Sequence, residues 1–146
     1  MATVELSFTA LPAHVRTARL VAAAVARRSG VDEAVLDEVR LAVGEACSRA
    51  VDLHLRFCPA EPVRVSLTDA PSGFVVEVTD CGPREEGSAD ALDPLRAVSE
   101  LEGDSLPLGV GLAVISGLVD DFAVEPAEAG MVVRMSWPVV AIPAPR

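Results

Sequence analysis

Charged and polar residues recur at helical spacing along an otherwise apolar segment, residues 36–52. Neighbours on a helix are three or four positions apart, so the apolar residues share one face and predict a core-facing helix. The polar residues form an adjoining stripe, which is a costly place for charge unless it borders a cleft or open water. Two interpretations stay open: a functional cleft, or a solvated stripe whose Glu45–Arg49 pair contributes only about 0.3 to 0.5 kcal/mol. The stripe consists of Glu38, Glu45, Ser48, Arg49 and Asp52.

A second candidate lies at the end of a predicted strand, where Asp80 is followed by Gly82. The carboxylate of Asp80 could accept a hydrogen bond from an exocyclic amine, and Gly82 would let the backbone approach a flat ring closely. An Asx-type turn that only ends the strand is the structural alternative.

A third candidate is the pair Gly109 and Gly111 at the entry to an apolar helix predicted over residues 108–119. Free backbone N–H groups at a helix start form an anion site that suits phosphate. A tight turn with close helix packing would use the same glycines, so the pair alone decides nothing.

The elements that must position these residues follow from hydrophobic periodicity and from glycine and proline breaks. A strand (3–9) precedes two helices (12–29, ended by Gly30, and 32–55). Next come two strands joined by a hairpin turn (63–67 and 74–79) and a long loop that we interpret as a lid (81–107). The order ends with the helix 108–119, two strands (122–125 and 131–137) and a loose tail (138–146). This order predicts a single α+β domain over residues 1–146: two layers, with helices on one face of a mixed, mostly antiparallel sheet.

Composition limits the classes of partner. The chain has 146 residues and a formal net charge of −10, and all 12 of its basic residues are arginine. Nucleic acid and anionic membrane surfaces both require a basic face, so we expect neither as a general partner. A basic protein partner fits the charge, and no apolar run reaches the roughly 18 residues of a membrane span. We expect a bacterial, cytoplasmic protein.

Three cysteines, Cys47, Cys58 and Cys81, form no CxxC pair. An odd number without such a pair fits a reducing cytosol better than a disulfide framework, and two separated histidines argue against zinc. The simplest interpretation is a core-facing Cys47 and small packing residues at the other two positions, with redox sensing by Cys81 as the alternative.

Together the three motifs, in this order and spacing, resemble the GHKL ATP-binding fold, and more closely the small anti-sigma-factor serine kinases of the RsbW and SpoIIAB type. Residues 45–51 are similar to the N-box of that family, residues 80–82 to its first glycine box and residues 109–112 to its second. The similarity runs from the first strand to Trp137.

The resemblance implies an ATP cleft between helices and sheet. In that family Glu45 would be the general base that takes a proton from a partner's serine as phosphate is transferred. Asp80 would hold the adenine amine beside Gly82. The residues implied at the phosphates are Gly109, Gly111 and Leu112, with Arg49 at the cofactor as well.

The N-box departs from the family pattern. The family usually has asparagine four residues after the base, where it binds magnesium, and this chain has Arg49 there. A guanidinium stays protonated and offers no lone pair to a metal ion, so no metal ligand is assigned and magnesium and ATP are both doubtful cofactors. Arg49 could instead contact phosphate oxygens or neutralise Glu45.

Three functions therefore stay open. The leading hypothesis is an anti-sigma-factor-like regulator that binds an RNA polymerase sigma factor or an anti-anti-sigma factor, commonly as a homodimer, with weak or lost kinase activity. The alternatives are an active ATP-dependent serine kinase that phosphorylates an anti-anti-sigma partner, and a nucleotide or small-molecule sensor without a sigma factor. The sequence does not name the sigma factor, the signal or the oligomeric state.

Overall fold

The computed structural model describes residues 2–82, 115 and 117–139. The elements follow in the order β1 (Ala2–Phe8), α1 (Pro12–Ser29), a 3₁₀ helix η1 (Glu33–Val35), α2 (Leu36–Phe57), β2 (Val63–Ala70), β3 (Gly73–Thr79), β4 (Asp121–Pro126) and β5 (Met131–Trp137). Residues 115, 117 and 118 are helical, within the helix predicted over 108–119. The predicted lid from residue 83 onward, and the tail from residue 140, lie outside the described residues.

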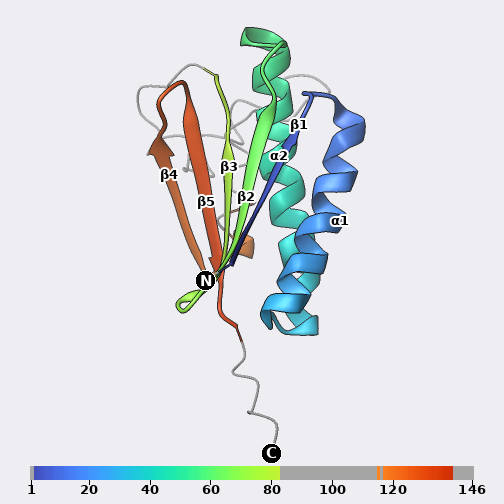
Figure 1. Ribbon diagram of the computed structural model, residues 1–146, viewed down its shortest axis with the longest axis vertical. Coiled ribbons are helices and arrows are strands. Elements are labelled where there is room, and N and C mark those ends of the chain that lie inside the picture. Colours follow the sequence, from blue (N-terminus) through green and yellow to red (C-terminus); the bar gives the residue numbers. More distant parts are fainter. Residues whose placement is uncertain (1, 83–114, 116, 140–146) are drawn as a thin grey trace, which may run out of the picture.

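The five strands form one sheet in the order β1-β2-β3-β5-β4 (Figure 1). All four pairings between the described strands are antiparallel. The predicted α+β class with helices on one face is therefore confirmed, and the described pairings include no parallel pair. Pairing of β3 with β5 brings the end of β3 beside the start of β5, since Thr79 lies opposite Val132.

Both helices lie on one side of the sheet (Figure 1). Alternate residues of each strand face them, as the period of two requires. In β2 these are Val63, Val65 and Leu67, and in β5 they are Met131, Val133, Met135 and Trp137, all of them buried. The core is mostly aliphatic, with the rings of Phe74 and Trp137 stacked at 6.2 Å between centroids.

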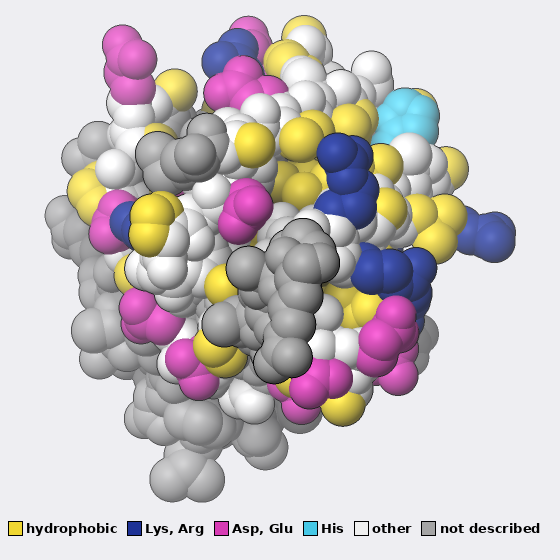
Figure 2. Space-filling view, turned by 60° about the horizontal axis from the view of Figure 1, so that its bottom comes forward, with side chains coloured by type: hydrophobic (Ala, Val, Ile, Leu, Met, Phe, Trp, Pro, Cys, Tyr) yellow, Lys and Arg dark blue, Asp and Glu magenta, His cyan; other side chains and the backbone are white. Residues whose placement is uncertain are grey.

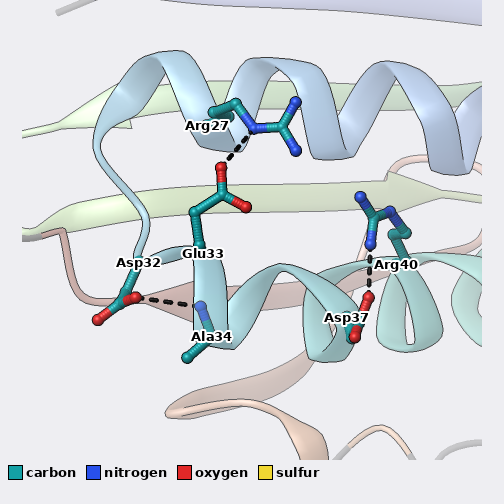
Figure 3. Close-up of polar contacts among 6 residues, drawn as sticks. All are labelled: Arg27, Asp32, Glu33, Ala34, Asp37 and Arg40. Carbon is teal, nitrogen blue, oxygen red and sulfur yellow. Dashed lines mark hydrogen bonds and ion pairs between the residues drawn. The ribbon is translucent and has the colours of Figure 1, made fainter.

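Helix α1 begins at Pro12 and ends where Gly30 adopts a left-handed conformation, with φ of 98°. Glycine takes this conformation without the steric penalty of a Cβ atom, so the predicted stop at Gly30 is confirmed. The next turn is held by polar contacts (Figure 3): Asp32 accepts a hydrogen bond from the Ala34 amide at 3.0 Å, and Arg27 pairs with Glu33. This turn sets α2 antiparallel to α1.

The second helix differs from the predicted range 32–55 at its start. Asp32 caps the short η1, and α2 begins only at Leu36 and continues to Phe57. Strand β2 also extends beyond the predicted 63–67 to Ala70, because a two-residue turn at Pro71 and Ser72 lets Ala70 pair directly with Gly73. In the described part of the chain, neither helix is long and apolar enough to cross a lipid bilayer.

Cys47 lies on α2 and is fully buried, which confirms its predicted position in the core. Burial raises the pKa of its thiol from 9.0 to about 12, because the thiolate would lose its hydration among apolar neighbours. The folded protein therefore holds the thiol proton more tightly than the unfolded chain does.

This difference predicts a loss of stability at alkaline pH. The contribution of Cys47 is complete below pH 9 and is lost as the pH rises toward 12. We expect the free energy of unfolding, measured by urea denaturation, to fall by about 1 kcal/mol more in the wild type than in Cys47→Ala when the pH rises from about 8 to about 10. Equal losses in the two proteins would show that the thiol is hydrated in the folded state.

Candidate functional site

A buried ion pair joins α2 to the end of β3. The guanidinium Nη1 of Arg49 donates to Oδ2 of Asp80 at 3.0 Å. The exposed fractions of the two side chains are 8% and 1%, so water screens the pair very little. The contact connects the position of the expected magnesium ligand with the carboxylate expected to hold adenine.

The second oxygen of Asp80 is occupied by backbone groups. Oδ1 accepts from the amide of Gly82 at 2.9 Å and from the amide of Met131 at 3.3 Å. The amide of Asp80 itself donates to the carbonyl of Met131 at 2.9 Å. The carboxylate thus accepts three hydrogen bonds, and its two oxygens are held by α2, by β5 and by the turn that follows β3.

Arg49 is less completely satisfied than its partner. Its Nε atom is buried without a hydrogen-bond partner among the described residues. An unmet buried donor costs about 1 to 3 kcal/mol, whereas removal of one partner from a buried pair typically costs about 3 to 5 kcal/mol. The paired arrangement is therefore the more stable one, because either charge buried without its partner would lower the stability of the fold more than the unmet Nε donor does.

The rest of the stripe on α2 is open to solvent to differing degrees. Glu38, Ser48 and Asp52 are exposed, and Glu45 is half-buried. Among the described residues no side-chain hydrogen bond or ion pair involves Glu45. Pairing of Arg49 with Glu45 was one of the alternatives left open, and in the structure the guanidinium donates to Asp80 instead. That Glu45 acts as a catalytic base stays a prediction.

Close packing fixes the backbone around Asp80. A Cβ atom built on Gly130, in the β4–β5 connection, would lie 2.7 Å from the carbonyl carbon of Asp80 and 2.8 Å from Cα of Cys81. On the other side, a Cβ on Gly82 would lie 3.1 Å from the side chain of Leu53. Gly82 therefore packs closely against the side chain of Leu53, and its approach to a flat ring stays a prediction.

A cavity of about 370 Å³ opens beside this turn. Its lining includes His54, Arg64, Thr79, Asp80, Cys81 and Glu128. The ring of His54 is 1% exposed; its Nδ1 lies 2.8 Å from the carbonyl oxygen of Glu61, and its Nε2 accepts a hydrogen bond from the amide of Cys81 at 3.1 Å.

The cysteines correct a second expectation. Cys58 and Cys81 form a disulfide, with 6.5 Å between their Cα atoms, so they are not the separate packing residues that their spacing predicted. The two are 23 positions apart in the sequence and meet because α2 ends beside the end of β3. Gly109, Gly111 and Leu112, expected at the phosphates, lie outside the described residues.

Comparison with known proteins gives the family. Residues 8–137 match the family described as the histidine kinase-like ATPase domain. The chain belongs to this family. A similar solved structure is that of the RsbU and RsbW domains of Rv1364c from Mycobacterium tuberculosis, with a TM-score of 0.65 and 15% sequence identity. The match covers 95% of this chain and 33% of the other, and no curated protein matches the sequence.

The description of the family as an ATPase domain suggests nucleotide binding. The described residues of this histidine kinase-like domain can be compared with what such a site requires. The residues do not fit a magnesium ion at position 49, because Arg49 is a cation without lone pairs. The carboxylate of Asp80 already accepts three hydrogen bonds and its side chain is 1% exposed, so an adenine amine does not reach it in this arrangement. The described part of the site therefore does not fit a magnesium nucleotide with Arg49 in this position.

One signal in the sequence could have located Arg49. Counting along α2 in steps of three and four, position 49 follows Ala42 and Ala46 and precedes Leu53, and all three are buried. An arginine in the middle of a buried row needs a buried acid opposite it. Asp80 ends a strand that is itself buried, which makes it the expected partner.

We expect Arg49→Ala to lower the free energy of unfolding by about 3 to 5 kcal/mol, because it leaves the Asp80 carboxylate buried and unpaired. Arg40→Ala is the matched control, since Arg40 lies on the same helix and pairs only with the exposed Asp37. That control should cost at most about 1 kcal/mol in the same urea titration. Similar losses for the two variants would contradict a buried pair.

The packing at Gly130 generates a second prediction. We expect Gly130→Ala to lower the unfolding midpoint clearly, because its Cβ would meet backbone that cannot move aside. Gly117→Ala is the control: among the described residues, and apart from its chain neighbours and its own helix backbone, no atom lies within 4 Å of a Cβ built there. Alanine also favours a helix by about 1 kcal/mol over glycine. Thermal unfolding followed by circular dichroism compares the two, and an unchanged midpoint for Gly130→Ala would disprove the close approach.

Proposed function

We propose that this histidine kinase-like domain is an anti-sigma-factor-like regulator that acts by binding a protein partner and has little or no kinase activity. The partner is an RNA polymerase sigma factor, an anti-anti-sigma factor, or both, and the regulator acts as a homodimer. A single domain with a lid over residues 81–107 belongs to the same proposal. The ion pair between Arg49 and Asp80 carries the argument.

The resemblance assigns to Asp80 the recognition of the adenine amine, which requires an oxygen free to accept a hydrogen bond. In this chain Oδ2 accepts from Arg49, and Oδ1 accepts from two backbone amides. The Asp80 side chain is 1% exposed, so an adenine amine could reach it only if the groups around it moved; moving Arg49 away would leave two buried charges apart, at a cost of several kcal/mol.

The charge of the chain supports a protein partner. The net charge of −10 would attract a basic protein and speed its association. Figure 2 shows acidic side chains spread over the face turned to the viewer, with several arginine side chains beside hydrophobic ones on one side of it. Such a mixed surface can bind a protein through apolar contacts and through complementary charge.

The active serine kinase is the second candidate. Glu45 favours it, because its carboxylate is half-buried on α2 and makes no contact with a described basic residue. A base in that state is available to a hydroxyl group of a partner. A sensor without a sigma factor is the third candidate, and the cavity beside His54 would be its ligand site.

Calorimetry and phosphate transfer separate these functions. We expect no saturable heat when the wild type is titrated with ATP and magnesium, and no radiolabel on a candidate anti-anti-sigma protein after incubation with labelled ATP. The same candidate, or a candidate sigma factor, should still bind to the protein in a pull-down assay. Label on a partner serine would establish the kinase and overturn the proposal.

Arg49→Asn is the sharper test of the ion pair, because it restores an amide oxygen at position 49 and frees Oδ2 of Asp80. If the rest of the cleft is intact, we expect this variant to gain magnesium-dependent ATP affinity of about tenfold or more, equivalent to about 1.4 kcal/mol. Arg40→Asn, on the exposed side of the same helix, should gain none. A variant that folds and still shows no affinity would mean that more than Arg49 closes the cleft.

A further inference from the structure

Three side chains with metal-binding or nucleophilic atoms meet at one end of the molecule, outside the ion pair just described. His54 and Cys58 come from the last turn and the end of α2, and Cys81 follows β3. Their ring nitrogen and sulfur atoms all lie within 4.8 Å of one another. In Figure 1 the end of α2 and the end of β3 both lie at the top of the molecule.

The hydrogen bonds of His54 define its protonation. A carbonyl oxygen only accepts, so the contact with Glu61 places the proton of the neutral ring on Nδ1. A backbone amide only donates, so the contact with Cys81 makes Nε2 the unprotonated nitrogen. The imidazole is therefore held as a neutral ring whose one lone pair, on Nε2, accepts the amide of Cys81 while the disulfide is closed. Nε2 can take a proton from the Cys81 thiol only when this hydrogen bond opens in the reduced protein.

The two cysteines, both half-buried, differ in their position relative to the cavity. Cys81 lines the cavity of about 370 Å³ together with His54, and Cys58 is not among the described residues of that lining. A small solute in the cavity would therefore lie beside Cys81. Cys58, already within bonding distance on the other side, is placed to react second.

We propose that His54, Cys58 and Cys81 form a peroxide-reactive dithiol site, in which Cys81 is the nucleophile, His54 takes its proton and Cys58 closes the disulfide. The thiolate, rather than the thiol, is the reactive form of cysteine, and a neighbouring base increases its population. The substrate class is a small hydroperoxide, with hydrogen peroxide as the simplest member. The site does not depend on the proposed function, since neither a nucleotide nor a protein partner takes part.

The chemistry balances in two steps. In the first step the Cys81 thiolate attacks one oxygen of hydrogen peroxide, the O–O bond breaks, and the other oxygen leaves as hydroxide and takes the proton from His54 to become water. In the second step the Cys58 sulfur attacks the sulfenic acid of Cys81, and a second water leaves. Two thiols are oxidised to one disulfide, and one peroxide is reduced to two waters.

A metal ion could use the same three atoms, and the structure favours the dithiol. Nε2 of His54, the only nitrogen of that ring able to bind a metal, already accepts the amide of Cys81. The two sulfur atoms are bonded to each other, so neither is a thiolate ligand. The structure therefore holds these atoms as a disulfide with a hydrogen-bonded histidine, and binding of Zn²⁺ to the reduced protein is the competing outcome of the test below.

Oxidation would tie α2 to the residue next to Asp80. Arg49 and Cys58 belong to the same helix, and Asp80 and Cys81 are adjacent, so the disulfide and the ion pair connect the same two elements. Opening the disulfide removes one of these two connections. We therefore expect the reduced protein to unfold at a lower temperature than the oxidised protein.

The test uses the full chain, reduced with dithiothreitol and then freed of reductant. We expect one equivalent of hydrogen peroxide to convert Cys58 and Cys81 to the disulfide, seen as the loss of two iodoacetamide-reactive thiols by mass spectrometry, and dithiothreitol to restore both. Cys47 should stay unlabelled in the native protein throughout, because it is buried. Cys47→Ala is the matched control and should oxidise at the wild-type rate.

Variants assign the roles. Cys58→Ser should stop at the sulfenic acid of Cys81, which dimedone labels, whereas Cys81→Ser should give no dimedone label at Cys58. His54→Gln should slow the reaction of reduced protein with peroxide by about tenfold or more. Diamide, which oxidises dithiols without peroxide, should still close the disulfide in His54→Gln and so show that both thiols can pair, and an unchanged circular dichroism spectrum should show that the variant is folded.

Three results would overturn the proposal. The first is a disulfide that millimolar dithiothreitol does not open in the native protein, because the bond would then be permanent. The second is dimedone label on Cys58 in Cys81→Ser at the rate seen for Cys81. The third is stoichiometric binding of Zn²⁺ to the reduced protein that blocks its oxidation, which would make the cluster a metal centre.

Discussion

The ion pair between Arg49 and Asp80 is the constraint on which the rest of the site depends. Two opposite charges lie in the space between helix and sheet, with exposed fractions of 8% and 1%. Neither charge is stable there without the other, so the end of β3 must stay against α2. The Gly82 and Met131 amides, which bind the second oxygen of Asp80, extend the constraint to the following turn and to β5.

The same constraint explains why a family fold can persist while its chemistry changes. The sheet order, the helices and the acid at the end of β3 fit a histidine kinase-like ATPase domain. Arg49 donates a hydrogen bond to Asp80 from within the chain. The resemblance assigns this donor role to the adenine amine of a nucleotide. A surface that binds a protein does not require this carboxylate, so we infer that partner binding can continue where nucleotide chemistry is weakened.

Much of the fold could be predicted from the sequence because it depends on local patterns. The helix from Pro12 to Gly30 and the strand from Met131 to Trp137 follow from proline, glycine and alternating apolar residues, and both are confirmed. The start of α2 was placed too early, because the cap at Asp32 belongs to a separate turn of 3₁₀ helix. Spacing within a segment predicts elements well, and their ends less well.

The candidate site was predicted only in part, because its contacts join distant segments. The position of Asp80 directly after a strand predicts that its carboxylate belongs to the site. The predicted hydrogen-bond partner of this carboxylate is a ligand, whereas the partner in the structure is Arg49. The disulfide between Cys58 and Cys81 could not be predicted from spacing, since they are 23 positions apart and meet only because the end of α2 lies beside the end of β3. Glu45 shows the reverse case: its position on α2 was predicted, and its role as a base stays a prediction.

A double-mutant cycle for Arg49 and Asp80 measures the central interaction most directly. The free energies of unfolding of Arg49→Met, Asp80→Asn and the double variant are compared with that of the wild type. A buried, mutually dependent pair predicts that the double variant is less destabilised than the sum of the single variants, by about 2 kcal/mol or more. Additivity within about 0.5 kcal/mol would contradict the account, because the two charges would then be independent of each other.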